Sequence, residues 1–256
     1  MFFDSHAHFD DERFNRDRET LLQNMQQKGV RYILNAASDI DTSQKCVELT
    51  EKYDFIYASV GVHPHNVAGI TENDMQLLMH LSKHSKVVAI GEIGLDYYYD
   101  HSPREEQKYW FRRQIQLAKQ LNLPVIIHNR DAHADSMEII QAEDISTIGG
   151  VIHCFSGSWE MAKKLIAMGI YISIAGPITF KNAVKSVEVV KNLPMDKILI
   201  ETDSPYLTPV PYRGKRNDSS YIKYVAEKIA EIKGLTVKEV AQKTMENAKR
   251  LFKIAD

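Results

Sequence analysis

Short apolar runs alternate with longer amphipathic stretches along the whole chain. Eight runs are mainly apolar and often β-branched, and they occupy positions 2–4, 32–37, 56–62, 87–90, 124–127, 150–152, 171–175 and 198–200. Nearly continuous apolar runs are typical of strands that are covered on both faces, as in a parallel sheet. The pattern therefore predicts eight buried strands.

The stretches between these runs carry apolar residues at helical spacing among charged ones. Residues 104–120 are the longest of the early examples, and the preceding Ser102 and Pro103 form a helix-start signal. Further helices are expected at 161–168, 183–191, 221–232 and 237–252. Eight strand–helix units predict an α/β protein with a (β/α)8 TIM barrel, built as a single domain over residues 1–256. A doubly wound open sheet is the alternative, but no Gly-rich phosphate-binding turn follows an early strand.

The composition is that of an ordinary globular protein, with 44% hydrophobic and 26% charged residues. A net charge of −2 gives no overall attraction to polyanions, so binding of nucleic acid would need a local basic cluster. Cys46 and Cys154 lack C-x-x-C spacing, which fits free thiols in a reducing compartment. No apolar run is long enough for a bilayer, and residues 1–6 show no signal-peptide pattern. The sequence thus predicts a cytoplasmic protein without a membrane segment.

Histidines and carboxylates follow the predicted strands where the next loop begins. Alternation along a strand places His6 and His8 on one face. Other members of this set, each from a different strand, are Glu92, His128, His153 and Asp203. A lone histidine after an apolar run is more often a core residue than a ligand. Since C-terminal strand ends form one mouth of a barrel, however, six such residues predict a metal centre there.

Six ligands exceed the three protein ligands that one catalytic zinc ion usually has. They are enough for two divalent ions about 3.5–4 Å apart that share a carboxylate and activate a water for hydrolysis. We assign one ion to His6, His8 and Asp203, the other to His128 and His153, and the bridging position to Glu92. Imidazoles favour Zn²⁺ or Mn²⁺, whereas carboxylates and waters suit Mg²⁺.

Three carboxylates are candidates for proton transfer or for orienting the imidazoles. Asp203 is the candidate for the carboxylate that takes and returns a proton during hydrolysis. By strand alternation, Asp4 shares the face of His6, and Glu201 that of Asp203. Each of these two carboxylates either orients an imidazole or is buried and paired elsewhere.

A basic loop at 209–217 follows Asp203 and contains Arg213, Lys215 and Arg216. Cationic donors suit phosphate oxygens, although such a loop is as often simply a solvated surface. The same face holds further candidate substrate contacts, namely His63, His65, Arg130 and Lys181. Stacking faces for bases are offered by Tyr97, Tyr98, Tyr99 and Trp159, but a tyrosine run is more often packing.

The chain resembles the TatD family of deoxyribonucleases, which are amidohydrolase-like TIM barrels. The resemblance covers almost the whole chain and rests on ordered motifs: DSHAH at 4–8, GVHPH at 61–65, GEIGLDYY at 91–98, LPVIIH at 123–128 followed by RDA at 130–132, HCFSG at 153–157, TFKNA at 179–183, ETDSPYL at 201–207 and RGKRN at 213–217.

This resemblance implies divalent-metal dependence and hydrolysis of DNA phosphodiesters, often as a 3′-to-5′ exonuclease on single strands. It implies the same six ligands and places His63 near the scissile phosphate, so the expected catalytic set is Asp203, Glu92 and His63. One departure is DSS at 218–220, where relatives usually carry an acidic residue and then proline. The missing proline leaves the stiffness of the basic loop open.

Two other functions remain open at this stage. The same metal site could hydrolyse amide or carboxylic ester bonds, such as aminoacyl esters, although the Arg213–Arg216 cluster favours phosphate. A non-catalytic binding protein is the third reading, and the intact set of six ligands disfavours it.

Overall fold

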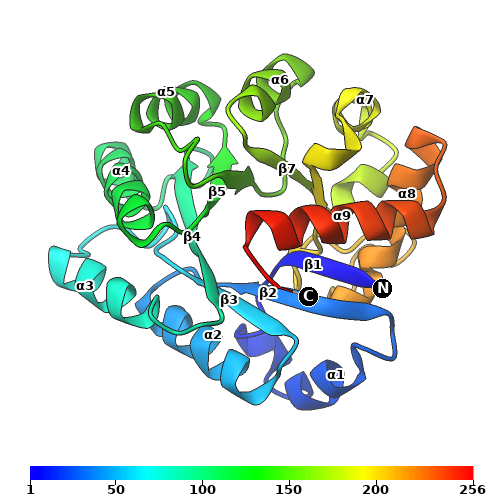
Figure 1. The fold of residues 1–256 in the computed structure, drawn as a ribbon, viewed down its shortest axis with the longest axis horizontal. Coiled ribbons are helices and arrows are strands. Elements are labelled where there is room, and N and C mark those ends of the chain that lie inside the picture. The colour runs from blue at the N-terminus through cyan, green and yellow to red at the C-terminus, as the bar shows by residue number, and fades with distance from the viewer. Residues whose placement is uncertain (256) are drawn as a thin grey trace.

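The computed structural model describes residues 1–255 and shows eight parallel strands inside a ring of helices (Figure 1). Neighbouring strands pair in sequence order from β1 to β8. The strands are β1 (Phe2–Ala7), β2 (Val30–Ala36), β3 (Ile56–Val60), β4 (Val87–Asp96), β5 (Val125–Arg130), β6 (Gly150–Ile152), β7 (Tyr171–Ile174) and β8 (Ile198–Ile200). The predicted (β/α)8 TIM barrel is confirmed.

The helices include all five ranges expected from the sequence, each within two residues at either end. They are α1 (Arg18–Asn24), α2 (Ile40–Lys52), α3 (Glu72–Leu81), α4 (Arg104–Leu121), α5 (His133–Glu143), α6 (Trp159–Ala167), α7 (Val184–Asn192), α8 (Ile222–Lys233) and α9 (Val237–Leu251). Short 3-10 helices occur at Glu12–Phe14, Gly176–Thr179, Met195–Lys197 and Ser219–Tyr221. None of the helices in the described part of the chain has the length and apolar character needed to cross a bilayer.

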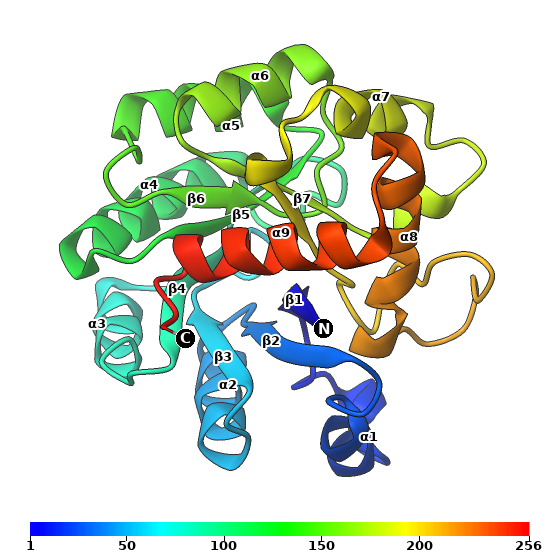
Figure 2. The ribbon, with the colours of Figure 1, turned by 45° about the vertical axis from the view of Figure 1, so that its right-hand side comes forward.

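Two apolar cores hold the barrel together. The larger one lies between strands and surrounding helices, and Ile33, Ile90 and Phe111 are among its buried members. The smaller one joins Leu34, Leu199 and other strand residues to Phe252, just after α9. Figure 2 shows α9 lying across the strands. Because α9 covers the interior at one end, the opposite end is left for polar chemistry.

The barrel closes between β1 and the segment that follows β8. The backbone N–H of Asp203 donates to the carbonyl of His6 at 2.9 Å, and the N–H of His8 donates to the carbonyl of Ser204 at 2.8 Å. Residues from the first and last strands are thus fixed side by side at the mouth.

Strands β1 and β4 continue beyond their apolar runs. β4 reaches Asp96 rather than position 90, and every residue in it is buried. Among the six candidate ligands, His6, Glu92 and His128 therefore belong to the sheet itself, whereas His8, His153 and Asp203 follow directly or closely after a strand.

Gly94 lets β4 and β5 approach each other closely at the mouth. Its φ is +138°, and a Cβ at this position would lie 2.0 Å from the carbonyl oxygen of His128. By contrast, Gly69 also has a positive φ (+83°), but a Cβ there would meet nothing within 4 Å. Both glycines thus have a positive φ, but only Gly94 lacks space for a Cβ atom.

We therefore expect Gly94→Ala to lower the free energy of unfolding by about 3 kcal/mol, because the methyl group pushes β5 away. Gly69→Ala is the matched control and should cost only about 1 kcal/mol, the strain of a left-handed residue. Urea unfolding followed by circular dichroism measures both values. Equal losses in the two variants would contradict the close-approach argument.

Candidate metal centre

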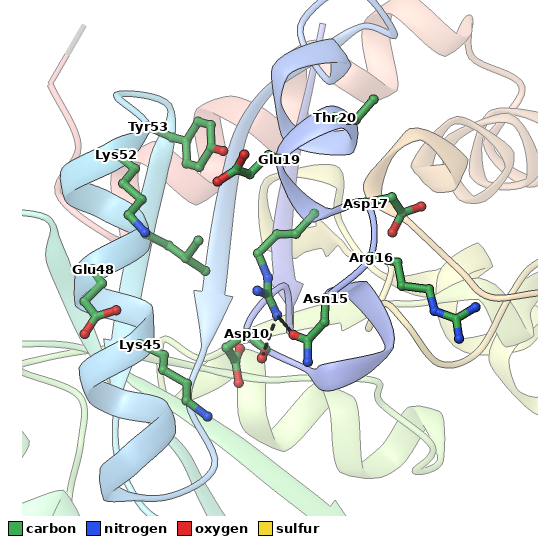
Figure 3. Close-up of a pocket in the computed structure, with 12 residues that line it drawn as sticks. Asp10, Asn15, Arg16, Asp17, Glu19, Thr20, Lys45, Glu48, Lys52 and Tyr53 are labelled. Atoms are coloured by element: carbon green, nitrogen blue, oxygen red, sulfur yellow. Dashed lines mark hydrogen bonds between the residues drawn. The ribbon is translucent and has the colours of Figure 1, made fainter.

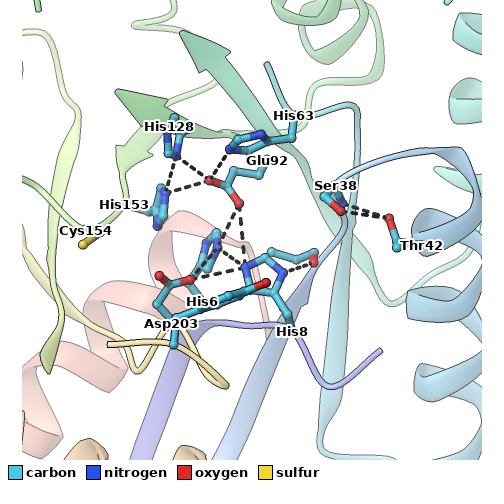
Figure 4. A network of polar contacts seen from close by, with 12 residues as sticks. His6, His8, Ser38, Thr42, His63, Glu92, His128, His153, Cys154 and Asp203 are labelled. Atoms are coloured by element: carbon cyan, nitrogen blue, oxygen red, sulfur yellow. Dashed lines mark hydrogen bonds and ion pairs between the residues drawn. The ribbon is translucent and has the colours of Figure 1, made fainter. Parts of the chain in front are cut away.

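The carboxylate of Glu92 lies at the centre of a buried polar cluster at the barrel mouth (Figure 4). Its Oε1 is 2.8 Å from His128 Nδ1 and 2.7 Å from His153 Nε2. Its Oε2 is 3.3 Å from His6 Nε2 and 3.8 Å from His8 Nε2. Each oxygen of one carboxylate thus faces its own pair of imidazoles.

Asp203 lies beside the first pair of imidazoles. Its Oδ1 is 3.3 Å from His8 Nε2 and 3.8 Å from His6 Nε2. Asp203 adopts a left-handed backbone conformation, with φ of +55°. This backbone turn, together with its hydrogen bond to His6, brings the carboxylate over the mouth. The structure therefore brings all six predicted ligands together.

The spacing within each pair of imidazoles tests whether the cluster suits divalent ions. His6 Nε2 and His8 Nε2 are 3.1 Å apart, and His128 Nδ1 and His153 Nε2 are 3.2 Å apart. Two nitrogens bound about 2.1 Å from one ion are about 3.0–3.4 Å apart at octahedral to tetrahedral angles. Both pairs have this separation, and a carboxylate oxygen faces each pair. The donor set fits two divalent ions.

Hydrogen bonds on the outer side of two rings direct their lone pairs inward. His8 Nδ1 lies 2.8 Å from the carbonyl oxygen of Ala36, which can only accept a hydrogen bond. His128 Nε2 lies 2.9 Å from Asp96 Oδ2. In each neutral ring the outer nitrogen carries the hydrogen, so His8 Nε2 and His128 Nδ1 are free to bind a cation.

Glu201 and Asp4, the two carboxylates predicted either to orient an imidazole or to be paired elsewhere, have different partners. Glu201 Oε1 is 3.4 Å from His153 Nδ1 and accepts from the backbone N–H of Cys154 at 2.6 Å, so it lies behind an imidazole. Asp4 instead accepts from the backbone and hydroxyl of Thr202 and from the hydroxyl of Ser219. The register of β1 against β2 shifts between Asp4 and Ala7, so simple alternation does not carry over to the histidines.

Ser219 fixes the end of the basic loop. Its hydroxyl is buried and donates to Asp4, while Asp218 accepts from the backbone N–H of Ser220 at 2.8 Å. The segment at 218–220, where a proline is missing, is therefore tied to β1 by the hydrogen bond from Ser219 to Asp4.

His63 differs from the other rings because its inner nitrogen carries a hydrogen. Its Nδ1 accepts from the backbone N–H of His65 at 3.1 Å, so Nε2 bears the hydrogen and points at Glu92 Oε1, 3.4 Å away. Burial lowers the pKa of His63 to about 4. At neutral pH this ring is an uncharged hydrogen-bond donor at the mouth.

Charges within the cluster compensate one another. Burial favours the neutral form of Glu92, but the neighbouring imidazoles, His153 foremost, outweigh it and hold its pKa well below the usual range. Burial likewise opposes protonation of His8, yet the carboxylates of Asp203 and Glu92 raise its pKa to about 9. Without metal, protons on imidazoles neutralise the carboxylates, and a cation has to displace them.

A family model described as TatD related DNase matches residues 3–253. The chain belongs to the TatD family.

TatD-family relatives align over nearly their whole length. A protein of Bacillus subtilis strain 168, named as the uncharacterized metal-dependent hydrolase YabD, is 51% identical, with 99% of this chain and 100% of that protein covered. The 3′-5′ ssDNA/RNA exonuclease TatD of Shigella flexneri is 33% identical, with 99% of both covered. The crystal structure of YjjV, a TatD homologue of Escherichia coli K12, has a TM-score of 0.93 at 32% identity and covers 99% of this chain and 98% of that one. The chain is thus a metal-dependent hydrolase of the TatD family.

The predicted substrate contacts of this TatD protein are only partly gathered at the centre. His65 is close, with Nε2 3.0 Å from Asp96 Oδ2. Arg130 ends β5, while the exposed Lys181, Arg213 and Lys215 lie on loops. Arg216 is directed elsewhere: its guanidinium binds both carboxylate oxygens of Asp17 at 2.9 and 2.6 Å and anchors the loop beside α1.

Asp96 is the site residue that the sequence analysis missed. It is buried, and its Oδ2 contacts the outer nitrogens of both His128 and His65. Its Oδ1 accepts from the backbone N–H groups of Tyr98 and Tyr99 at 3.0 and 2.8 Å. Asp96 has the same alternation as Glu92 in GEIGLD, which is the sequence signal that would have pointed to it.

A cavity of about 560 Å³ lies away from this centre, between α1 and α2 (Figure 3). None of the six candidate ligands lines it. Arg18 on its wall is held by the carbonyl oxygens of Phe9, Asp10 and Asp11. Its charged walls are therefore partly satisfied within the protein, and the cavity does not compete with the mouth as the catalytic site.

We expect Asp96→Asn to weaken metal binding about 10- to 100-fold. If the asparagine oxygen keeps the turn to Tyr98 and Tyr99, its NH₂ group faces His128 Nε2 and drives the hydrogen onto Nδ1, which then cannot bind a cation. Calorimetric titration with Mn²⁺ measures the affinity. Asp54→Asn, at a fully exposed aspartate, is the control, and unchanged affinity in Asp96→Asn would contradict the orienting role.

Proposed function

We propose that the protein hydrolyses DNA phosphodiester bonds as a 3′-to-5′ exonuclease on single strands. The observation that carries this proposal is the Glu92 carboxylate between two imidazole pairs at ligand separation. Such a site suits two ions that clamp the attacking and leaving oxygens of a phosphodiester. The relative named as an exonuclease, TatD of Shigella flexneri, supports the choice of nucleic acid.

The proposed ion ligands are the six residues of the cluster. His6, His8 and Asp203 would hold one ion, His128 and His153 would hold the other, and Glu92 would be shared by the two. Mg²⁺, Mn²⁺ and Zn²⁺ are all compatible with mixed imidazole and carboxylate donors. When bound, the ions lower the pKa of water and neutralise charge on the phosphate.

Two residues of this chain accept the proton and bind the phosphate. Asp203 has its carboxylate at the mouth, and its neighbours hold its pKa below the usual value despite burial, so it is an ionised proton acceptor at neutral pH. His63 presents an uncharged Nε2–H, which donates to a non-bridging phosphate oxygen. Neither role requires a protein residue to form a covalent bond with substrate.

Cationic side chains around the mouth favour phosphate as the group recognised. Arg130 lies two residues after His128 in β5, and Arg213 and Lys215 are exposed on the loop after β8. Because the net charge is −2, attraction of DNA depends on local cations such as these. We also propose a cytoplasmic location, which suits the two free thiols of Cys46 and Cys154.

Glu92→Ala should lower turnover of single-stranded DNA by about 100-fold or more, because the two ions lose their shared ligand. Elemental analysis should show loss of metal, while circular dichroism shows a retained fold. Glu105→Ala, at an exposed glutamate of α4, is the control. Cleavage at the wild-type rate by Glu92→Ala would refute the site, and cleavage of an amide or aminoacyl ester panel in place of DNA would refute the substrate.

Metal affinity should rise with pH up to about 9. Below this value His8 carries a proton in the metal-free protein, since its pKa is raised to about 9, and a cation must displace that proton. Binding of Mn²⁺ at neutral pH therefore releases protons. Titrations in two buffers of different ionisation enthalpy measure the release directly, and equal heats in both would contradict it.

A further inference from the structure

An arginine contacts two exposed tyrosines beside the metal centre. The guanidinium carbon of Arg130 lies 4.0 Å from the ring centroid of Tyr98 and 4.8 Å from that of Tyr99. These tyrosines are 58% and 51% exposed. Within residues 1–255 the Arg130 guanidinium has no hydrogen-bond or ion-pair partner, so its N–H donors are available.

A continuous series of rings connects this group to the catalytic cluster. The Tyr99 ring is 5.4 Å from the ring of His65, which is 4.3 Å from the ring of His63, measured between centroids. His101 stacks on Tyr99 at 5.5 Å with an interplanar angle of 8°. The exposed tyrosines therefore lie at the edge of the mouth, on the β4–β5 side.

A second pair of the same kind lies on the other side of the mouth. Tyr206 follows β8 and is 45% exposed, and the guanidinium carbon of Arg13 lies 4.0 Å from its ring centroid. Its ring contacts that of His8 edge-on at 6.1 Å. In the strand order β1 to β8, the β4–β5 side and the β8–β1 side are diametrically opposed.

We propose that these two tyrosine–arginine pairs bind nucleobases on opposite sides of the scissile phosphate, so that a single strand of DNA crosses the mouth from the β4–β5 side to the β8–β1 side. The inference rests on the proposed function and assigns its substrate path. Tyr98 and Tyr206 are its stacking residues, and Arg130 is its phosphate donor.

The chemistry of each pair supports stacking. One face of each tyrosine is covered by a guanidinium, and the high exposure leaves ring surface for a base. Base–aromatic stacking is tolerant of sequence, as a nuclease without base specificity requires. A guanidinium stacked on a ring keeps its in-plane N–H groups free to bind phosphate. Asp96 fixes the backbone of Tyr98 and Tyr99, so the first platform is preformed.

Binding tests the platforms without catalysis. Oligonucleotides with a single 2-aminopurine at successive positions are titrated with the full chain in EDTA, and quenching of the fluorescence reports stacking. We expect Tyr98→Ala and Tyr206→Ala each to abolish quenching at a different position and to weaken binding about 10-fold. Tyr98→Phe and Tyr206→Phe should retain both, since the ring is kept. Tyr109→Ala is the matched control, because Tyr109 is 53% exposed on the outer helix α4.

Cleavage then separates this inference from the proposed function. With Mn²⁺ present, an abasic residue at the position read by Tyr98 should lower kcat/KM about 10-fold for the wild type and leave it unchanged for Tyr98→Ala. Cleavage of DNA with equal abasic effects in all proteins, or with Tyr98 and Tyr206 reading the same position, overturns the path and leaves the nuclease intact. Absence of both quenching and cleavage overturns both, whereas quenching without cleavage supports the platforms and overturns the nuclease.

Discussion

The structure depends on one buried carboxylate, that of Glu92, being surrounded by imidazole nitrogens. A carboxylate removed from water is strongly destabilised unless charges and hydrogen bonds compensate it. Here the compensation comes from nitrogens of five imidazoles within 4 Å of its two oxygens, namely His6, His8, His63, His128 and His153. The need to bring these groups together constrains every element at the mouth.

A closed barrel meets that constraint because its strands end at a common rim. The five imidazoles come from the ends of four strands, β1, β3, β5 and β6, and β4 supplies the carboxylate. Close approach of β4 to β5 at Gly94 and hydrogen bonding across the β1–β8 seam hold these ends in register. The other end of the barrel, which α9 covers, is filled by apolar side chains and has a purely structural role.

The architecture and the ligand cluster could be predicted because both follow short-range rules. Apolar runs mark buried strands. Residues that follow these strands converge at one mouth, independently of the length or conformation of the loops. Asp96 was missed because it lies beyond the apolar run at 87–90, and only the fold shows that β4 extends far enough to bring it to His65 and His128. Arg216 illustrates the opposite failure: its charge suggested substrate, but only the fold shows that Asp17 lies close enough to bind it.

The bulge-like shift in β1 had a similar effect on Asp4. Strand alternation assigned it to the face of the histidines, whereas the register shift leaves it hydrogen-bonded to Thr202 and Ser219. Patterns of alternation thus hold within a regular strand and fail where pairing is interrupted. Such interruptions depend on the partner strand, which local sequence does not reveal.

The seam between β1 and the segment after β8 has a consequence for synthesis of the protein. His6 and His8 are translated almost two hundred residues before their partner Asp203. A nascent chain therefore lacks the complete set of candidate ligands until Asp203 has been made. The ligand cluster can assemble only after the strand pairing across this seam has formed.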